Sequence, residues 1–154
     1  MPAAGEFMQP ASKVVTVYPD STLRAVAVAM AQERVGCVVV QDGGMGGKPV
    51  GILTQSDVVK AWTMDAKLED PVSMHMSTAL HACLPGDSRD AVAELLFNNK
   101  VHHALVCKED GSFLGLVSSW DIAREAALDA KAWPWTRHAP AAAADDKEKI
   151  PYFW

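Results

Sequence analysis

The sequence has few of the features that mark secreted or membrane proteins. Cysteine is scarce, with three among 154 residues at irregular spacing, which does not make a disulfide framework. No run of about 18 apolar residues is present to span a bilayer, and the first residues lack the basic start and the apolar run of a secretory signal. We therefore expect a cytoplasmic protein with no membrane partner, in which Cys37, Cys83 and Cys107 are small core residues.

Positive charge is also in short supply. The chain has 14 Lys and Arg residues against 19 Asp and Glu residues, a formal net charge of −5. Such a protein generates no broad positive field that would hold a polyanionic duplex, which argues against a nucleic-acid partner. Since 49% of the residues are hydrophobic, a chain of this length can bury one ordinary core, or two very small ones, without disulfides or metals.

Patterns of catalytic and metal-binding residues are missing too. The chain has no Cys-x-x-Cys or His-x-x-x-His spacing and no serine in a Gly-x-Ser-x-Gly setting. His102 and His103 are adjacent in an expected strand, so their side chains should point to opposite faces and not line one site. The glycine-rich residues 43–47 lie between two strands, unlike a phosphate-binding loop that precedes a helix. We expect neither an enzyme nor a metal site.

What the chain does contain is an internal repeat. Residues 8–12 align with residues 74–78 at an offset of 66, which also aligns Pro19 with Pro85. After a loop that is two residues shorter in the second copy, residues 51–57 align with residues 115–121 at an offset of 64. The chain therefore consists of two copies of one unit. The predicted boundaries are 8–64 for the first repeat, 65–71 for a linker, 72–130 for the second repeat and 131–154 for a C-terminal tail.

Hydrophobic periodicity predicts the order β-α-β-β-α in each copy. The expected elements of the first copy are a strand at 14–17, a helix from an N-cap at Asp20 or Ser21 to about Arg34, strands at 37–40 and 49–53, and a helix at 56–64. Those of the second copy are strands at 80–84, 103–107 and 113–117, and helices at 88–99 and 119–129. Because one sheet face is too large for its own helices to cover, we expect an α/β (α+β) fold whose repeats pack sheet to sheet with pseudo-twofold symmetry.

Each copy carries the pattern Gly-hydrophobic-x-Thr/Ser-x-x-Asp, at residues 51–57 and again at 115–121. With the strand patterns at 35–40 and 101–106, these motifs resemble a tandem pair of cystathionine β-synthase (CBS) domains, the Bateman module. The resemblance implies a non-catalytic regulatory sensor that binds an adenosine-containing ligand, AMP, ADP, ATP or S-adenosylmethionine, in clefts between the repeats. It also implies a homodimer and an unidentified effector protein. The alternative is a ligand-free structural module for dimerisation or interaction.

The resemblance further implies which residues line the two clefts. One cleft would hold Ile52, Thr54 and Asp57 facing Thr78, Val101 and His102. The other would hold Leu116, Ser118 and Asp121 facing Ser12 and Val35, with His103 near its phosphate side. An ionised Asp accepts hydrogen bonds from ribose hydroxyls, while a Thr or Ser hydroxyl and a helix N-terminus suit phosphates. Because two histidines follow Val101, whereas a glycine and a cysteine follow Val35, the cleft at Asp57 is the one expected to be occupied.

Plainer interpretations of these motifs stay open. Thr54 with Asp57, and Ser118 with Asp121, also fit the capping pattern of a helix N-terminus, and capping is compatible with ligand contact. Bulky Trp120 replaces a serine of the first copy and is expected to alter access to Asp121. The aromatic residues 150–154 would pack on the module or on a dimer mate, or would anchor a partner protein. The helix faces expected at a dimer contact contain Val58, Trp62, Ile122 and Ala126.

Overall fold

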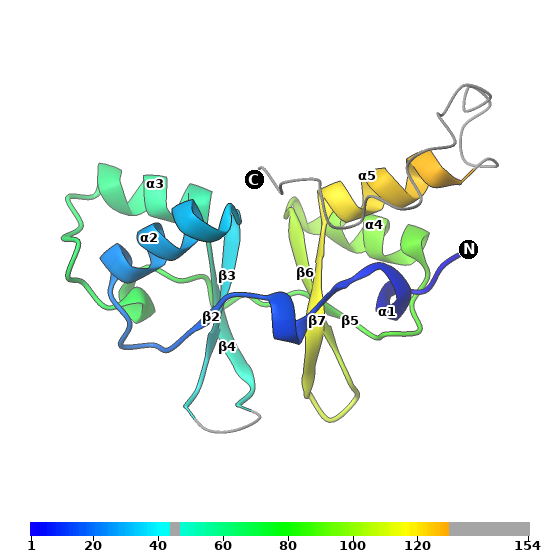
Figure 1. Ribbon diagram of the computed structural model, residues 1–154, viewed down its shortest axis with the longest axis horizontal. Coiled ribbons are helices and arrows are strands. Elements are labelled where there is room, and N and C mark those ends of the chain that lie inside the picture. Colours follow the sequence, from blue (N-terminus) through cyan, green and yellow to red (C-terminus); the bar gives the residue numbers. More distant parts are fainter. Residues whose placement is uncertain (44–46, 130–154) are drawn as a thin grey trace.

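A computed structural model describes residues 1–43 and 47–129 as two lobes that lie side by side (Figure 1). The first lobe has a three-stranded sheet in the order β2-β3-β4, and the second lobe a four-stranded sheet in the order β1-β7-β6-β5. The two sheets face each other in the middle of the molecule, and the long helices lie outside them. The predicted α/β fold, with sheet-to-sheet packing and pseudo-twofold symmetry, is confirmed.

The first lobe follows the predicted order of elements. Its elements are β2 (Thr16–Val17), α2 (Leu23–Glu33), β3 (Cys37–Gln41), β4 (Pro49–Thr54), α3 (Gln55–Thr63) and a 3-10 turn η2 (Val72–Met74). The N-cap of α2 is Thr22, whose hydroxyl accepts the N–H of Ala25, so the predicted cap at Asp20 or Ser21 is wrong. The Ser21 hydroxyl instead accepts the N–H of Tyr18 and stabilises the preceding turn.

The second lobe repeats the β-α-β-β-α order and adds the three short elements α1, β1 and η1. Its elements are α1 (Ala4–Phe7), β1 (Gln9–Pro10), a 3-10 turn η1 (Ala11–Lys13), β5 (Ala82–Cys83), α4 (Arg89–Asn99), β6 (His103–Cys107), β7 (Phe113–Ser118) and α5 (Ser119–Leu128). The helices α2 and α4 both end at a residue in the left-handed region, Arg34 and Lys100, each with φ of 53°. The first long helix of each repeat therefore ends in the same backbone conformation.

The hydrophobic residues form three layers. Val38 and Val40 of β3 point to the helices of the first lobe, and the core of the second lobe is built the same way around Ala104 and Val106 of β6. Successive strand residues point to opposite faces, so the residues between them face the other sheet. This middle layer consists of Cys37, Val39, Leu105 and Leu116, all buried. Burial on both faces explains why β3 and β6 are continuous apolar runs in the sequence.

The segments that precede β2 in the first repeat and β5 in the second, here called the leading segments, are exchanged between the lobes. In the N-terminal one, Ala4 and Phe7 are buried in the core of the second lobe, and β1 pairs antiparallel with β7. In the other, Val72 is buried in the core of the first lobe, and Ser77 bridges to Ile52 of β4. Sequence reasoning missed α1 and β1 because elements of four and two residues have no measurable periodicity.

The leading segments also correct the predicted alignment. The N–H of Ala4 donates to the carbonyl of Asp87 at 2.8 Å, and the N–H of Val72 donates to the carbonyl of Ser21 at 2.8 Å. These equivalent bonds align residue 4 with residue 72, an offset of 68, while residue 21 aligns with residue 87 at the predicted 66. The predicted offset of 66 for residues 8–12 is therefore wrong. The first copy has two additional residues in the connection that contains η1.

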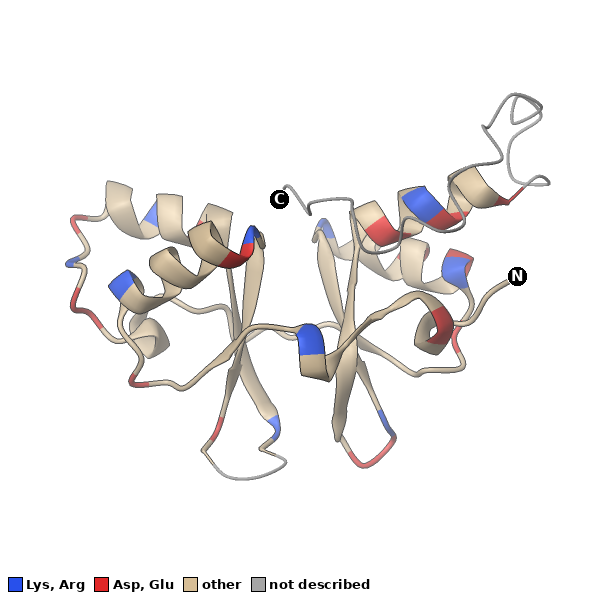
Figure 2. Ribbon diagram, viewed as in Figure 1, with Lys and Arg blue, Asp and Glu red and all other residues tan. Residues whose placement is uncertain are grey.

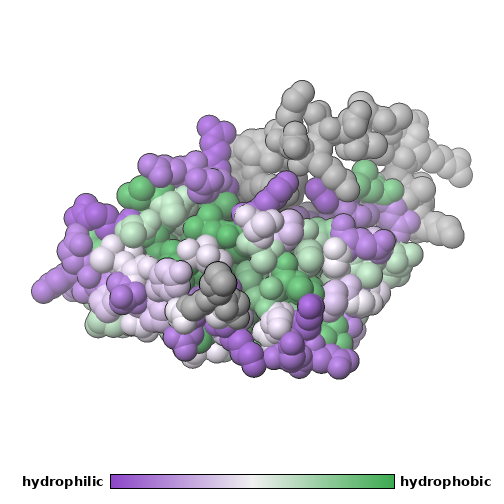
Figure 3. All heavy atoms as spheres, turned by 60° about the horizontal axis from the view of Figure 1, so that its bottom comes forward, coloured by the Kyte–Doolittle hydropathy of each residue, from purple (hydrophilic) through white to green (hydrophobic). Residues whose placement is uncertain are grey.

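Charge and hydropathy follow the layers. Among the described residues, none of the strands contains Lys, Arg, Asp or Glu, and the charged residues lie on helices and loops (Figure 2). On the face at the hairpin end, hydrophobic side chains gather toward the middle and hydrophilic ones surround them (Figure 3). Within residues 1–43 and 47–129, no helix is both long and apolar enough to cross a bilayer. The predicted tail, residues 131–154, lies outside the described residues.

Candidate functional site

A cleft of about 690 Å³ opens between the two lobes. This volume lies within the range of roughly 300–1,000 Å³ that is usual for small-molecule sites. The apolar part of its wall includes Ile52, Leu80, Val101 and Leu105, and its polar part comes from the starts of α3 and α5. Both lobes therefore contribute to one cleft.

The starts of α3 and α5 converge on this cleft from opposite lobes (Figure 1). Each helix is fastened to the neighbouring strand in the same way: the N–H of Gln55 donates to the carbonyl of Gly36 at 3.0 Å, and the N–H of Ser119 donates to that of His102 at 2.8 Å. A helix N-terminus carries partial positive charge from the aligned peptide dipoles. Two of them at one cleft favour a bound anion.

The motif of the first repeat forms a capping box at the start of α3. The Asp57 Oδ2 accepts the Thr54 N–H at 2.8 Å and the Thr54 hydroxyl at 3.0 Å, and the Asp57 N–H donates to Thr54 Oγ1 at 3.3 Å. The capping interpretation is therefore confirmed. Within the described residues the second carboxylate oxygen, Oδ1, accepts no hydrogen bond, and Asp57 lines the cleft. The carboxylate is held in place with one oxygen still available.

The motif of the second repeat forms the same capping box, with Asp121 Oδ2 accepting the Ser118 N–H at 2.8 Å and the Ser118 hydroxyl at 2.7 Å. Its surroundings differ. Asp121 is only 4% exposed, and burial raises its pKa above the usual value for Asp despite the hydrogen bonds from Ser118. The same chemical pattern is thus a half-buried carboxylate in one lobe and a buried one in the other.

Most residues predicted for the first cleft do meet there. Its lining contains the predicted Ile52, Thr54, Asp57, Val101 and His102. Thr78 is exposed and does not line the cleft, although its neighbours on either side do. The wrong alignment of the leading segments caused this error, because the corrected offset makes Thr78 equivalent to a proline of β1 and not to Ser12.

Sequence reasoning missed several residues of this cleft. Lys100 lines it, as do His81 from the leading segment and Ser119 and Trp120 from α5. Trp120 was expected to alter access to Asp121, but it lies at the cleft of Asp57 instead. The repeat alone does not reveal that the starts of both helices face one cleft. That arrangement is what would have identified Ser119 and Trp120.

The second predicted cleft is nearly closed. It has a volume of about 30 Å³, comparable to that of one water molecule in the liquid, roughly 30 Å³. Of the predicted residues, Val35, His103, Leu116, Ser118 and Asp121 line it. Ser12 does not. It is exposed in η1, the extra turn that packs against β7 and whose end is held by a bond from the Gln9 side chain to the Lys13 carbonyl at 3.1 Å.

His103 differs most from its predicted role. It lines both clefts, and its side chain is largely buried. Burial, together with the neighbouring His102, lowers the pKa of His103 to about 4, so the imidazole is neutral at physiological pH and is no phosphate-binding cation. Its Nδ1 is buried without a hydrogen-bond partner in the described part of the chain.

The two adjacent histidines both line the larger cleft. The prediction that they could not share a site is wrong because His102 precedes β6, which begins at His103, so the strand alternation does not apply to the pair. Within residues 1–43 and 47–129, no three His, Cys, Asp or Glu side chains gather as a metal would require.

Known proteins match both halves of the chain. The family profile of the CBS domain matches residues 4–63 and 72–128. An uncharacterized 17.7 kDa protein from Acidianus ambivalens is 30% identical over 113 residues, 73% of this chain and 67% of that protein. The crystal structure of a CBS-domain containing protein from Agrobacterium tumefaciens has 30% identity and a TM-score of 0.66, covering 72% of this chain and 82% of that one. A CBS domain protein from Pyrobaculum aerophilum, complexed with AMP, shares the fold at 23% identity, with a TM-score of 0.71 over 82% of this chain and 99% of that one.

Proposed function

The chain belongs to the CBS-domain family, and from this premise we propose that it is a non-catalytic regulatory module that binds one adenosine-containing ligand at Asp57 and acts on a partner protein. The observation that carries the proposal is the difference between the two equivalent motifs. Within the described residues both motifs reach the cleft of about 690 Å³, but of the two Asp residues only Asp57 lines it, whereas Asp121 lines the space of about 30 Å³.

The Asp57 carboxylate suits a ribose. Thr54 holds one of its oxygens, and the other is free to accept hydrogen bonds from vicinal hydroxyls. Hydrogen bonds to an ionised carboxylate are roughly twice as strong as neutral ones. Asp57 is only partly buried, so water does not have to be stripped from an isolated charge before the ligand binds.

The rest of the cleft suits a phosphate and a base. Lys100 and His102 line it together with two helix N-termini, which favour an anionic group. The apolar Ile52, Leu80 and Leu105 offer a slot for a flat heterocycle. This balance of charge favours AMP, ADP or ATP over S-adenosylmethionine, whose sulfonium centre is positive. The AMP complex of the Pyrobaculum aerophilum relative supports the same ligand class.

The ligand signal would leave through an interface, either a homodimer or an effector protein. On α3, Val59 is 64% and Trp62 68% exposed, so this helix carries apolar surface available for contact. The sequence expectation needs adjustment, because Val58 and Ile122 pack against the cores of their own lobes. The homodimer, the effector and the cytoplasmic location stay predictions.

Titration calorimetry with AMP, ADP, ATP and S-adenosylmethionine tests the proposal. We expect saturable binding of at least one phosphate-bearing ligand and a ligand-dependent rise in melting temperature. GMP is the matched control for purine selectivity, and we expect it to bind more weakly. If none of the four adenosine ligands binds up to millimolar concentration, the proposal is wrong and the ligand-free interaction module, its alternative, takes its place.

A further inference from the structure

Trp120 is a large aromatic residue on the wall of the Asp57 cleft. It is the second residue of α5, it lines the cleft, and 44% of its surface is exposed. Ala123, three residues later on the same helix face, also lines the cleft. The equivalent position in α3 is Ser56, so the second lobe contributes an indole where the first contributes a hydroxyl.

Trp120 and Asp57 belong to different lobes and line the same cleft. The two helix starts come from different lobes and converge on the same cleft (Figure 1). A ligand anchored by its ribose at Asp57, in the first turn of α3, therefore has the first turn of α5 as its facing wall. Ser119 beside Trp120 carries a small side chain, so the indole is the broad surface on that wall.

An exposed indole in the wall of a cleft that also has apolar lining suits a flat aromatic ligand. Stacking on an aromatic side chain contributes roughly 1–3 kcal/mol per base, without requiring hydrogen bonds. We propose that the indole of Trp120 stacks on the base of the adenosine ligand that Asp57 holds by its ribose. This inference rests on the proposed function and assigns a further binding residue to the same site.

If so, each bound ligand bridges the lobes. Its ribose is held by α3 of the first lobe and its base by α5 of the second, so binding fixes the distance between two helices that no hydrogen bond joins within the described residues. An aromatic contact from the second lobe makes affinity sensitive to the relative position of the lobes. That sensitivity is what a regulatory module requires.

The test combines affinity with tryptophan fluorescence, using AMP as the probe, or whichever adenosine ligand saturates the wild type. Trp120→Ala should weaken binding about tenfold or more, while Trp120→Phe should stay within about threefold because phenylalanine also stacks. Stacking quenches indole emission, so saturation should quench the wild type, and Trp120→Phe should lose that quenching while still binding. Trp62→Ala and Trp62→Phe are matched controls, since Trp62 is exposed on α3 and does not line the cleft.

The possible failures are distinguishable. If the wild type binds an adenosine ligand but Trp120→Ala binds as tightly as Trp62→Ala, the inference is overturned and the proposed function stands. Unchanged quenching in Trp120→Phe overturns it as well. If the wild type binds none of the adenosine ligands, the proposed function fails and the inference fails with it.

Discussion

The two clefts carry the same motif but differ in almost everything else. Asp57 and Asp121 occupy equivalent positions in equivalent capping boxes, yet one lines a space of about 690 Å³ and the other a space of about 30 Å³. Gly36 and His103 line both spaces, whereas Val14 and Cys37 line only the smaller one. The same capping motif therefore lies at an open cleft in one lobe and at a nearly closed one in the other.

Substitutions that disturb the exchanged leading segments should give the largest difference in stability between the two lobes. A Cβ on Gly115 would collide with the backbone oxygen of Gln9 in β1, and would come within 2.7 Å of the Met8 sulfur. On Gly51 it would collide with the flexible end of Met76. Because overpacking costs about 1–3 kcal/mol, we expect Gly115→Ala to lower the free energy of unfolding by about 3 kcal/mol and Gly51→Ala by about 1 kcal/mol.

Urea unfolding of the two variants checks this difference. Gly43→Ala is the control, since a Cβ there would meet nothing within 4 Å, and its effect should stay below about 0.5 kcal/mol. Equal losses for Gly115→Ala and Gly51→Ala would mean that β1 does not hold its place on β7 in solution.

The pH dependence of stability should also differ between two equivalent positions, His103 in the second lobe and Cys37 in the first. The pKa of His103 is lowered to about 4 in the folded protein, against about 6.5 in an unfolded chain. The unfolded state therefore binds more protons between these values, and stability is fully present above pH 6.5 and falls as the pH drops. Linkage predicts a loss of about 2 kcal/mol between pH 7 and pH 5.

Chemical unfolding of the wild type and of His103→Gln at pH 7, 6 and 5 measures this loss. We expect the stability of the variant to depend less on pH, by about 2 kcal/mol over that range. Cys37→Ala should keep the wild-type pH dependence, because burial raises the pKa of the Cys37 thiol far above these pH values. A pH profile of His103→Gln that superimposes on the wild type would refute the burial of a neutral imidazole.

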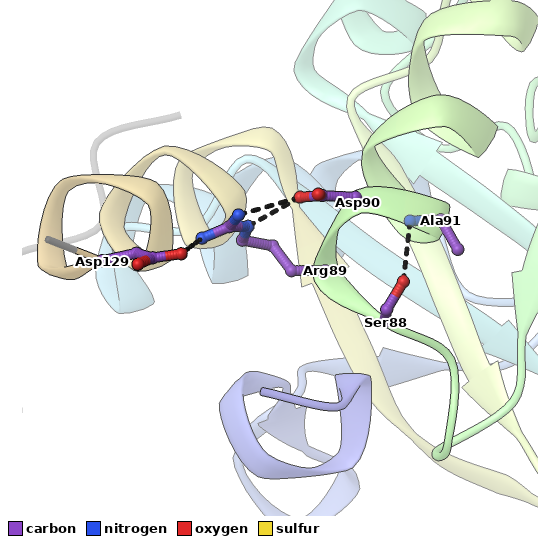
Figure 4. A network of polar contacts seen from close by, with 5 residues as sticks. All are labelled: Ser88, Arg89, Asp90, Ala91 and Asp129. Carbon is purple, nitrogen blue, oxygen red and sulfur yellow. Dashed lines mark hydrogen bonds and ion pairs between the residues drawn. The ribbon is translucent and has the colours of Figure 1, made fainter. Parts of the chain in front are cut away.

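Substitutions in the ion pairs of the two lobes should change the stability by a smaller amount. In the second lobe, Arg89 is 7% exposed and bonds to Asp90 and Asp129 at 2.9 Å (Figure 4). In the first lobe, Arg24 and Glu69 are 58% and 68% exposed. Removing Arg89 leaves two carboxylates that water can partly reach, so Arg89→Met should cost about 1.5 kcal/mol, and Arg24→Met less than about 0.5 kcal/mol.

Thermal or urea denaturation at 0.05 M and 0.5 M salt separates these two pairs. The loss for Arg89→Met should persist at high salt, since buried pairs are screened less. An effect of Arg24→Met as large as that of Arg89→Met would contradict the assigned difference in burial.

The sequence predicted the architecture well because the repeat constrains it. Strand β6 has the predicted bounds, and the helices α2 to α5 agree within about one turn. The errors are concentrated in the leading segments, where Ala4, Phe7 and Val72 are buried in the opposite lobe. Local patterns do not encode which lobe a short segment will join, since that depends on contacts between residues far apart in the sequence.

The candidate site was predicted in part for the same reason. Ile52, Thr54 and Asp57 lie on one motif and were identified together. Thr78 was misplaced through the alignment error, and Trp120 was assigned to the other cleft because the direction of α5 relative to α3 follows only from the packing of the two sheets. Sequence comparison located the two-residue difference in the hairpin loop, but it missed the two additional residues in the connection that contains η1 and so placed Ser12 wrongly in the second cleft.

Calorimetric titration with AMP of the wild type, Asp57→Ala and Asp121→Ala tests the central claim most directly. Both variants lose the same capping bonds, so both should lose a similar stability of about 1 kcal/mol. The account predicts one AMP per wild-type chain, affinity about 30-fold or more weaker in Asp57→Ala, and wild-type affinity in Asp121→Ala. Two AMP molecules per chain, or binding that survives in Asp57→Ala and is lost in Asp121→Ala, would contradict it.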